Sequence, residues 1–125
     1  MRWQGVIAVD DDPTIDGRIV RSSVLEKFDG RVVMYIGDPG LDLRTALGTV
    51  DRIEHHGNLW RAFGECRVEV PVGAACAMSL VSVESGIEED DEGRMVFTSG
   101  RLAAVWVRPD QEPVWPQAVI EPNPD

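Results

Sequence analysis

The segment spanning residues 47–70 constrains the fold more than any other part of the chain, because its second half alternates strictly. Between Trp60 and Val70 every second residue is small or apolar, and the intervening residues are mostly charged. A period of two sustained over this length is typical of a β-strand with one buried and one solvent-facing side. Residues 47–53 predict a shorter strand before it, and the HHGN sequence at 55–58 predicts the turn between the two. We therefore expect a central hairpin in an all-β domain.

The rest of the chain reads as short strands separated by turns. Apolar and β-branched runs predict further strands at 3–9, 19–20, 31–36, 78–84, 95–98 and 102–107. The last two are expected to form a hairpin around Ser99-Gly100, and the apolar LAAVWV run at 102–107 is expected to be covered on both sides. The side chains that we expect in the core are those of Ile53, Trp60, Cys66, Val68 and Val105.

Turn and loop signals fill the intervals. The acidic triplet at 10–12, which precedes a proline, predicts a solvated turn, and the acidic run at 88–92 predicts an exposed hairpin loop. Residues 23–28 predict a single helical turn, and residues 71–77 fit either a loop or a short helix. The segment 109–125 carries five prolines, so we expect an extended tail that packs on the domain or on a partner. The fold expected is a small β-barrel or sandwich over residues 1–108, followed by that tail.

Charge and composition exclude several classes of function. The net charge of −10 argues against nucleic acid and anionic membrane surfaces as partners, because both require clustered basic residues. Lys27 is the only lysine, and an arginine-rich basic set favours contacts with protein. The chain opens without the pattern of a signal peptide and has no apolar run long enough for a membrane helix, which predicts a protein made in a cytosol. No P-loop, no dinucleotide motif and no zinc spacing is present, so we expect neither a cofactor nor a metal.

The order of several segments resembles the capsid maturation (prohead) proteases of tailed bacteriophages. Each matching segment is short, but together they span residues 3–120 in the family's order. The segments are WQGVIAV at 3–9, TIDGR at 14–18, LGTVDRI at 47–53, VSVE at 81–84, FTSGRLAAVWV at 97–107 and PVWPQAVI at 113–120. The resemblance implies a compact β-barrel-like serine-protease fold.

The same resemblance implies a nucleophile at Ser82 and a histidine base before Gly48. The residue at the expected base position is Leu41, and residues 38–47 contain no histidine. A serine hydroxyl needs an adjacent base to attack at neutral pH. The remaining candidates are His55 or His56, or Lys27 in a Ser–Lys dyad, and all three are better explained as turn or surface residues; Asp42 is read as an exposed loop carboxylate. We therefore expect a degenerate, inactive relative of the protease.

The function expected from this reasoning is that of a virion structural protein. The leading interpretation is a capsid decoration (cement) protein that binds the major capsid protein as a homo-oligomer on the capsid lattice. Two alternatives remain: an active prohead maturation protease with Ser82 as nucleophile, and a scaffolding or head–tail adaptor protein. Trp, Tyr and Arg are the usual anchors of protein interfaces. The partner-binding candidates are Trp115, Trp3, Arg101 and Arg108, and a second interpretation folds Trp115 back onto its own domain.

Overall fold

The computed structural model of the protein describes residues 1–21, 25, 32–38, 43–81 and 86–122. Within these ranges the chain is mainly β, in one small domain without a helix, which confirms the predicted fold class as a sandwich-like arrangement rather than a closed barrel. The strands are β1 (Arg2–Val9), β2 (Ile19–Val20), β3 (Val32–Asp38), β4 (Leu43–Val50), β5 (Arg52–His56), β6 (Leu59–Glu65), β7 (Ala75–Val81), β8 (Ile87–Glu89), β9 (Met95–Phe97), β10 (Arg101–Arg108) and β11 (Ile120–Glu121).

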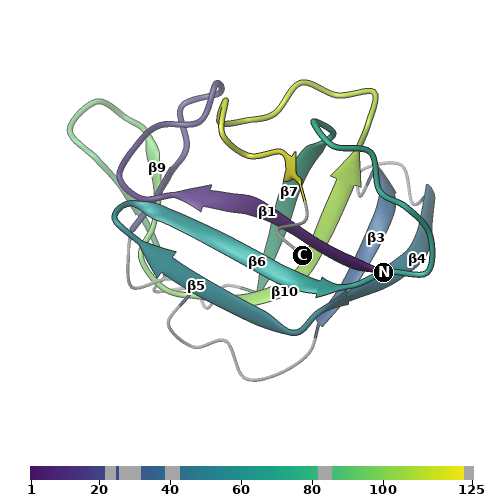
Figure 1. Cartoon of the computed structure of the whole chain (residues 1–125). Helices are drawn as coiled ribbons and strands as arrows, with labels where there is room; N and C mark the ends of the chain where they lie inside the picture. The colour runs from purple at the N-terminus through teal and green to yellow at the C-terminus, as the bar shows by residue number, and fades with distance from the viewer. Residues whose placement is uncertain (22–24, 26–31, 39–42, 82–85, 123–125) are drawn as a thin grey trace.

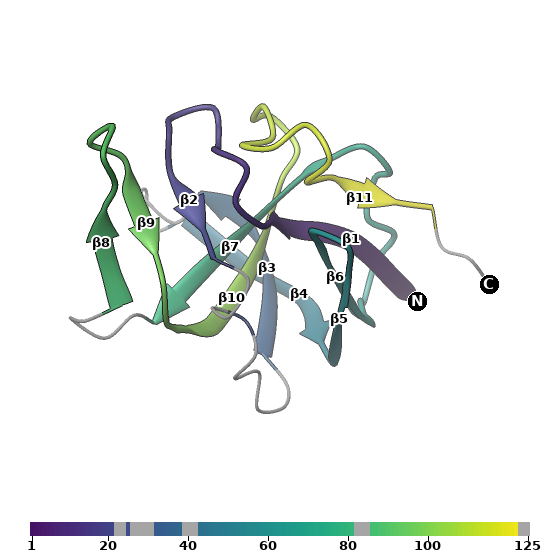
Figure 2. The same ribbon diagram turned by 90° about the vertical axis from the view of Figure 1, so that its left-hand side faces the viewer.

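These strands form two four-stranded sheets and one three-stranded sheet. One large sheet has the order β11-β1-β6-β5, and the other has the order β4-β3-β10-β7. The first lies across the second, with their strands crossing (Figure 1). The small sheet, β2-β9-β8, stands at one end of the molecule (Figure 2). Met34 and Val105 from one large sheet and Trp60 and Ala62 from the other belong to one buried cluster, so the core lies between the large sheets.

The two large sheets are joined at two places by backbone pairing between strands of different sheets, and we call these places seams. At one seam, Gly48 of β4 forms an antiparallel bridge with Cys66, directly after β6. At the other, the C-terminal segment reaches both sheets, because Ile120 pairs with Gly5 of β1 while Val119 bridges to Ala75 of β7. The segment predicted as an extended tail therefore lies against the β domain and contributes a strand to it.

The central hairpin is present, with a tighter turn than predicted. Its two strands are β5 and β6, and His55 and His56 belong to β5, where they pair with Trp60 and Leu59. The turn consists of Gly57 and Asn58, and Gly57 has a φ of 63°, a conformation that glycine adopts without strain. The predicted strand at 47–53 is wrong as a single element, because the chain breaks at Asp51 and the halves enter β4 and β5 of different sheets.

The burial predictions hold for the described core with one exception. Trp60, Cys66 and Val105 are buried, as predicted, and Ile53 is partly buried against the core. The side chain of Val68 is 52 % exposed, so its prediction was wrong. The alternation of β6 ends at Cys66, where the chain forms the bridge to Gly48 and then leaves the sheet.

Three other sequence predictions need correction or fall outside the described residues. β9 and β10 do not form a hairpin: β9 pairs with β2 and β8, whereas β10 lies between β3 and β7. The acidic run at 88–92 is not all loop, because its first two residues belong to β8. Asp90 closes the turn that follows by accepting hydrogen bonds from the backbone N–H groups of Glu92 and Arg94 at 3.0 and 2.8 Å. The helical turn predicted at 23–28 lies mostly outside the described residues.

Candidate functional site

The residues predicted from the protease resemblance are not among those that the structure describes. Ser82 and Leu41 lie in the ranges 82–85 and 39–42, and Asp42 and Lys27 also fall outside the described residues. The predictions for these four residues therefore stay predictions. The strand that leads to Ser82 is β7, which ends at Val81 opposite Arg101 of β10.

Both histidines of the chain are described, and each ring contacts a carboxylate. His55 Nε2 lies 2.6 Å from Asp10 Oδ2, and the His55 ring stacks on the Trp60 indole with 4.0 Å between centroids. A carboxylate accepts hydrogen bonds, so Nε2 is the nitrogen that donates to it. His56 Nε2 lies 3.0 Å from Glu54 Oε1, and this hydrogen bond is the main reason that the pKa of Glu54 is lowered.

Asp10 is the centre of a cluster with His55 and Trp60, which we call the Asp10 cluster. The burial of Asp10 corrects the prediction of a fully solvated acidic turn. Its side chain is only 6 % exposed, and its Oδ1 accepts a 2.7 Å hydrogen bond from the Trp60 indole. Its backbone N–H donates to Asn58 in the turn of the central hairpin. The cluster thus fastens the end of β1 to the β5–β6 hairpin. A buried carboxylate needs hydrogen-bond donors, and those of Asp10 come from residues far away in sequence, so no local signal marks it.

Two of the four predicted partner-binding residues lie in the core of this chain. Trp115 is 3 % exposed and its indole N–H donates to the Asp12 carbonyl at 2.7 Å. Trp3 is 4 % exposed and donates to the Thr49 carbonyl at 2.9 Å. The prediction that these indoles face a partner is therefore corrected, because their own domain already supplies both the apolar surroundings and the acceptor that a buried indole needs.

The other two candidates lie at opposite ends of β10. Arg101 is exposed at its start, and Arg108 is half-buried at its end. A partner could therefore reach the side chain of Arg101 and the exposed part of Arg108. Arg108 also lines the cavity described next, which Arg101 does not.

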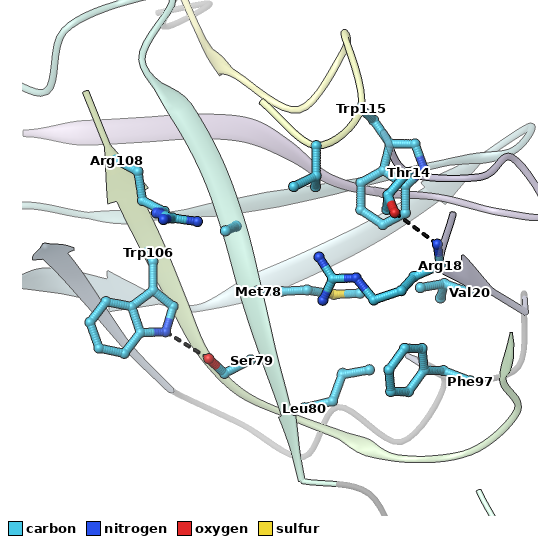
Figure 3. A pocket seen from close by; sticks show the side chains of 12 residues that line it. Thr14, Arg18, Val20, Met78, Ser79, Leu80, Phe97, Trp106, Arg108 and Trp115 are labelled. Carbon is cyan, nitrogen blue, oxygen red and sulfur yellow. Dashed lines mark hydrogen bonds between the residues drawn. The ribbon is translucent and has the colours of Figure 1, made fainter. Parts of the chain in front are cut away.

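A cavity of about 390 Å³ opens beside β7. Its walls are mostly apolar or aromatic, and Trp106, Trp115 and Phe97 contribute the largest rings (Figure 3). The charged residues among its described lining are Arg18 and Arg108, with no carboxylate. The sequence pattern does not reveal this cavity, because its lining comes from five separate segments: 14–20, 77–80, 97, 106–108 and 114–115.

The described residues offer little reactive chemistry outside this cavity. Cys66 and Cys76 are free thiols and both are buried, as predicted for Cys66. Burial raises the pKa of both thiols, that of Cys76 to about 12, so neither ionises near neutral pH. In the described part of the chain, no group of three or more His, Cys, Asp or Glu side chains is arranged to hold a metal ion. Nor does that part contain a helix that is long and apolar enough to cross a membrane.

Comparison of the chain with models of protein families, with curated proteins and with solved structures found no match.

Proposed function

We propose that this chain is a non-catalytic structural protein of a bacteriophage virion: a decoration protein that binds the major capsid protein in several copies on the capsid lattice. The proposal rests on the order of sequence segments that resembles the prohead proteases, and on Leu41 at the position where that family has its catalytic histidine. It places the protein in the host cytoplasm during synthesis and on the capsid afterwards.

The observation that supports the non-catalytic part most directly is how the two histidines are held. They are the only histidines of the chain, and each has its Nε2 bound to a carboxylate at the β5–β6 hairpin. The His55 ring is further fixed by stacking on Trp60. A serine nucleophile needs an imidazole oriented towards its hydroxyl. Here Asp10 and Trp60 hold the His55 ring as part of the contact between the end of β1 and the β5–β6 hairpin, which gives the imidazole a structural role.

An exposed apolar surface supports the structural role. In the small sheet, Ile87 lies opposite Phe97 and Glu89 lies opposite Met95, so these four side chains share one face of the β8–β9 hairpin. Ile87 and Met95 are 42 % and 47 % exposed. Apolar side chains grouped on a protruding, otherwise acidic hairpin are typical of a protein–protein contact. We call Ile87 and Met95 the hairpin patch, and we propose that the major capsid protein covers it.

Particle composition tests the proposal. Purified mature particles should contain the intact chain at a fixed ratio to the major capsid protein, since a decoration protein stays on the finished capsid. A chain found only in immature particles would support the scaffolding alternative and overturn the decoration role.

The substitution Ser82→Ala separates the proposal from the protease alternative. General-base assistance is typically worth about 10²–10⁴-fold in rate, so a serine without a base contributes almost no cleavage. Particles assembled with Ser82→Ala should therefore carry normally processed capsid protein, as judged by gel electrophoresis and mass spectrometry. The matched control is Ser99→Ala, at a serine between β9 and β10. Uncleaved capsid protein with Ser82→Ala alone would establish the protease alternative instead.

A further inference from the structure

β7 is an edge strand, and the fold already uses part of its open edge for pairing. In its sheet, β7 has β10 on one side only. On the other side, Cys76 N–H donates to the Ala118 carbonyl and Ile120 N–H donates to the Ala74 carbonyl, both at 2.8–2.9 Å. Within the described ranges, no strand pairs with this side of β7 beyond Cys76. The C-terminal segment therefore covers the start of the edge and, as far as the described residues go, leaves its continuation open.

The open part of the edge presents backbone groups for pairing. Successive residues of a strand direct their N–H and C=O groups to alternate sides. Because Cys76 N–H faces away from β10, the backbone groups of Met78 and Leu80 face the same way. An unpaired run of this kind is a template for another extended chain.

The cavity beside β7 extends along this open edge. Its lining includes side chains from both faces of the strand: Met78 and Leu80 on the core side, and Ser79 on the other. Figure 3 shows β7 passing through the cavity, with Trp106 and Arg108 to one side of it and Arg18 and Phe97 to the other. An extended chain lying along the edge would thus find a place for side chains on both of its faces.

The charged side chains that line the cavity are basic, although the protein as a whole is acidic. The chain carries 22 acidic and 12 basic residues, yet the charged side chains among the described lining are two arginines. Arg18 donates from its Nε to Asp16 Oδ1 at 3.1 Å, and it lies on the same side of β7 as Phe97 (Figure 3). Arg108 lies at the other side of the strand (Figure 3). Guanidinium groups that flank β7, Arg18 on its open side and Arg108 on the neighbouring strand β10, favour a ligand with carboxylate side chains.

We propose that the open edge of β7 binds an extended acidic segment of a partner protein, in which carboxylate side chains alternate with apolar ones. The segment adds a strand beside Met78–Leu80, its apolar side chains enter the cavity next to Phe97, and its carboxylates contact Arg18 and Arg108. This mode of binding combines main-chain hydrogen bonds for affinity with pockets on alternate sides for specificity. The inference concerns the peptide-binding edge itself and does not depend on the capsid role.

Peptide titration of the full chain, labelled with ¹⁵N, tests the proposal. The probes are blocked peptides of about eight residues, an ordinary strand length, with valine alternating with glutamate, glutamine or lysine. We expect the glutamate peptide to shift the amide resonances of Met78 and Leu80 saturably and to bind best. Non-specific attraction to a chain of net charge −10 would give the reverse order, with the lysine peptide strongest. A glutamate peptide that causes no shifts at millimolar concentration, or shifts elsewhere, overturns the proposal.

Two further comparisons separate strand addition from simple charge attraction. Two glutamate peptides can be made in which every second backbone nitrogen is methylated, one with the odd-numbered and one with the even-numbered amides blocked; we call these the two phases. Binding should be abolished in one phase only, since only one set of amides faces β7.

Arg18→Gln and Arg108→Gln should each weaken binding about fivefold to tenfold through loss of a charged hydrogen bond. Arg67→Gln, an exposed arginine outside the cavity, is the matched control, and the spectra report whether each variant is folded. Equal binding in both methylation phases, or an equal loss with Arg67→Gln, would contradict strand addition.

Discussion

At the scale of single residues, the four tryptophans are all at most 5 % exposed, and each indole N–H donates to an oxygen of another segment. Trp115 joins the C-terminal segment to the turn after β1 through the Asp12 carbonyl, and Trp106 reaches Ser79 on the neighbouring strand. Burying an indole with its N–H unpaired would destabilise the folded state. The position of each acceptor therefore helps to set the orientation of the ring. The tryptophans therefore act here mainly as core side chains.

Trp115 provides the first prediction. Trp115→Ala removes a ring that is 3 % exposed, and it should lower the free energy of unfolding by about 3–5 kcal/mol in urea titrations. Trp115→Phe keeps most of the packing and removes the hydrogen bond to Asp12, so it should cost about 1–3 kcal/mol. A Trp115→Ala variant with wild-type stability would show that the ring contributes little to the core and would return it to the list of interface anchors.

Cys76 provides a prediction of pH dependence. Burial raises the pKa of its thiol from 9.0 to about 12, so the folded state keeps the proton over a range in which the unfolded state loses it. The contribution of Cys76 to stability is thus complete below about pH 9 and is lost as the pH rises from there towards 12. Between pH 8 and about 10.5, wild-type stability should fall more steeply than that of Cys76→Ala in denaturant titrations. Parallel curves would indicate that the thiol ionises equally in both states.

The burial of individual residues is predictable from the two-residue period of a strand, and only as far along the chain as that period continues. Trp60 and Cys66 were placed correctly because β6 alternates as far as Cys66, whereas Val68 was misplaced because nothing local marks the point where the chain leaves the sheet. Asp10 was read as solvated because its donors, Trp60 and His55, lie far away in sequence. Trp115 was undecided for the same reason.

At the scale of elements, the strands were largely predictable from sequence and their partners were not. β1, β3 and the apolar β10 all carry local signals of β-branched and aromatic residues. Pairing depends on contacts between distant segments, so β9 was assigned to its neighbour β10 although it pairs with β2 and β8. The cavity beside β7 is a product of that pairing, which explains why the sequence did not reveal it although two candidate residues, Arg108 and Trp115, belong to its lining.

The seam between β4 and β6 gives the prediction for this scale. A Cβ atom on Gly64 would overlap the Thr49 carbonyl oxygen, and one on Gly48 would overlap the Glu65 carbonyl oxygen, so the two strands approach as closely as they do because neither position has a side chain. Gly64→Ala should therefore destabilise the fold by about 3 kcal/mol, measured by thermal and urea unfolding. Ala103→Ser, which adds one atom at an exposed site of β10, is the control and should change stability by less than about 0.5 kcal/mol. If the two variants were equally stable, β4 and β6 could move apart to admit the extra methyl group without a loss of unfolding free energy.

At the scale of the whole molecule, three features lie in different places. The two seams join the large sheets, and the Asp10 cluster joins strands within one of them. The open edge of β7 lies beside the arginine-lined cavity, and the hairpin patch belongs to the small sheet at one end (Figure 2). The hairpin patch and the cavity adjoin at Phe97, which lies opposite Ile87 and lines the cavity. Ile87 and Met95 themselves are not among the described lining residues, so substitutions at these two positions leave that lining unchanged.

The hairpin patch gives the last prediction, which rests on the proposed capsid role. Ile87 and Met95 are exposed in the free chain, so replacing both with Asp should lower the melting temperature of the isolated protein only slightly, chiefly through repulsion from Glu89, which lies opposite Met95. On the capsid the same charges would be buried against an apolar partner surface without a counter-ion, which should weaken binding by roughly 2 kcal/mol or more. Co-sedimentation with particles that lack the chain measures this loss. Val72→Asp is the matched control, because Val72 is 63 % exposed but lies in the loop between β6 and β7. If the double variant sediments with particles at the wild-type level, the capsid contact lies elsewhere on the molecule; if only the double variant is lost, the hairpin patch is the surface that the capsid covers.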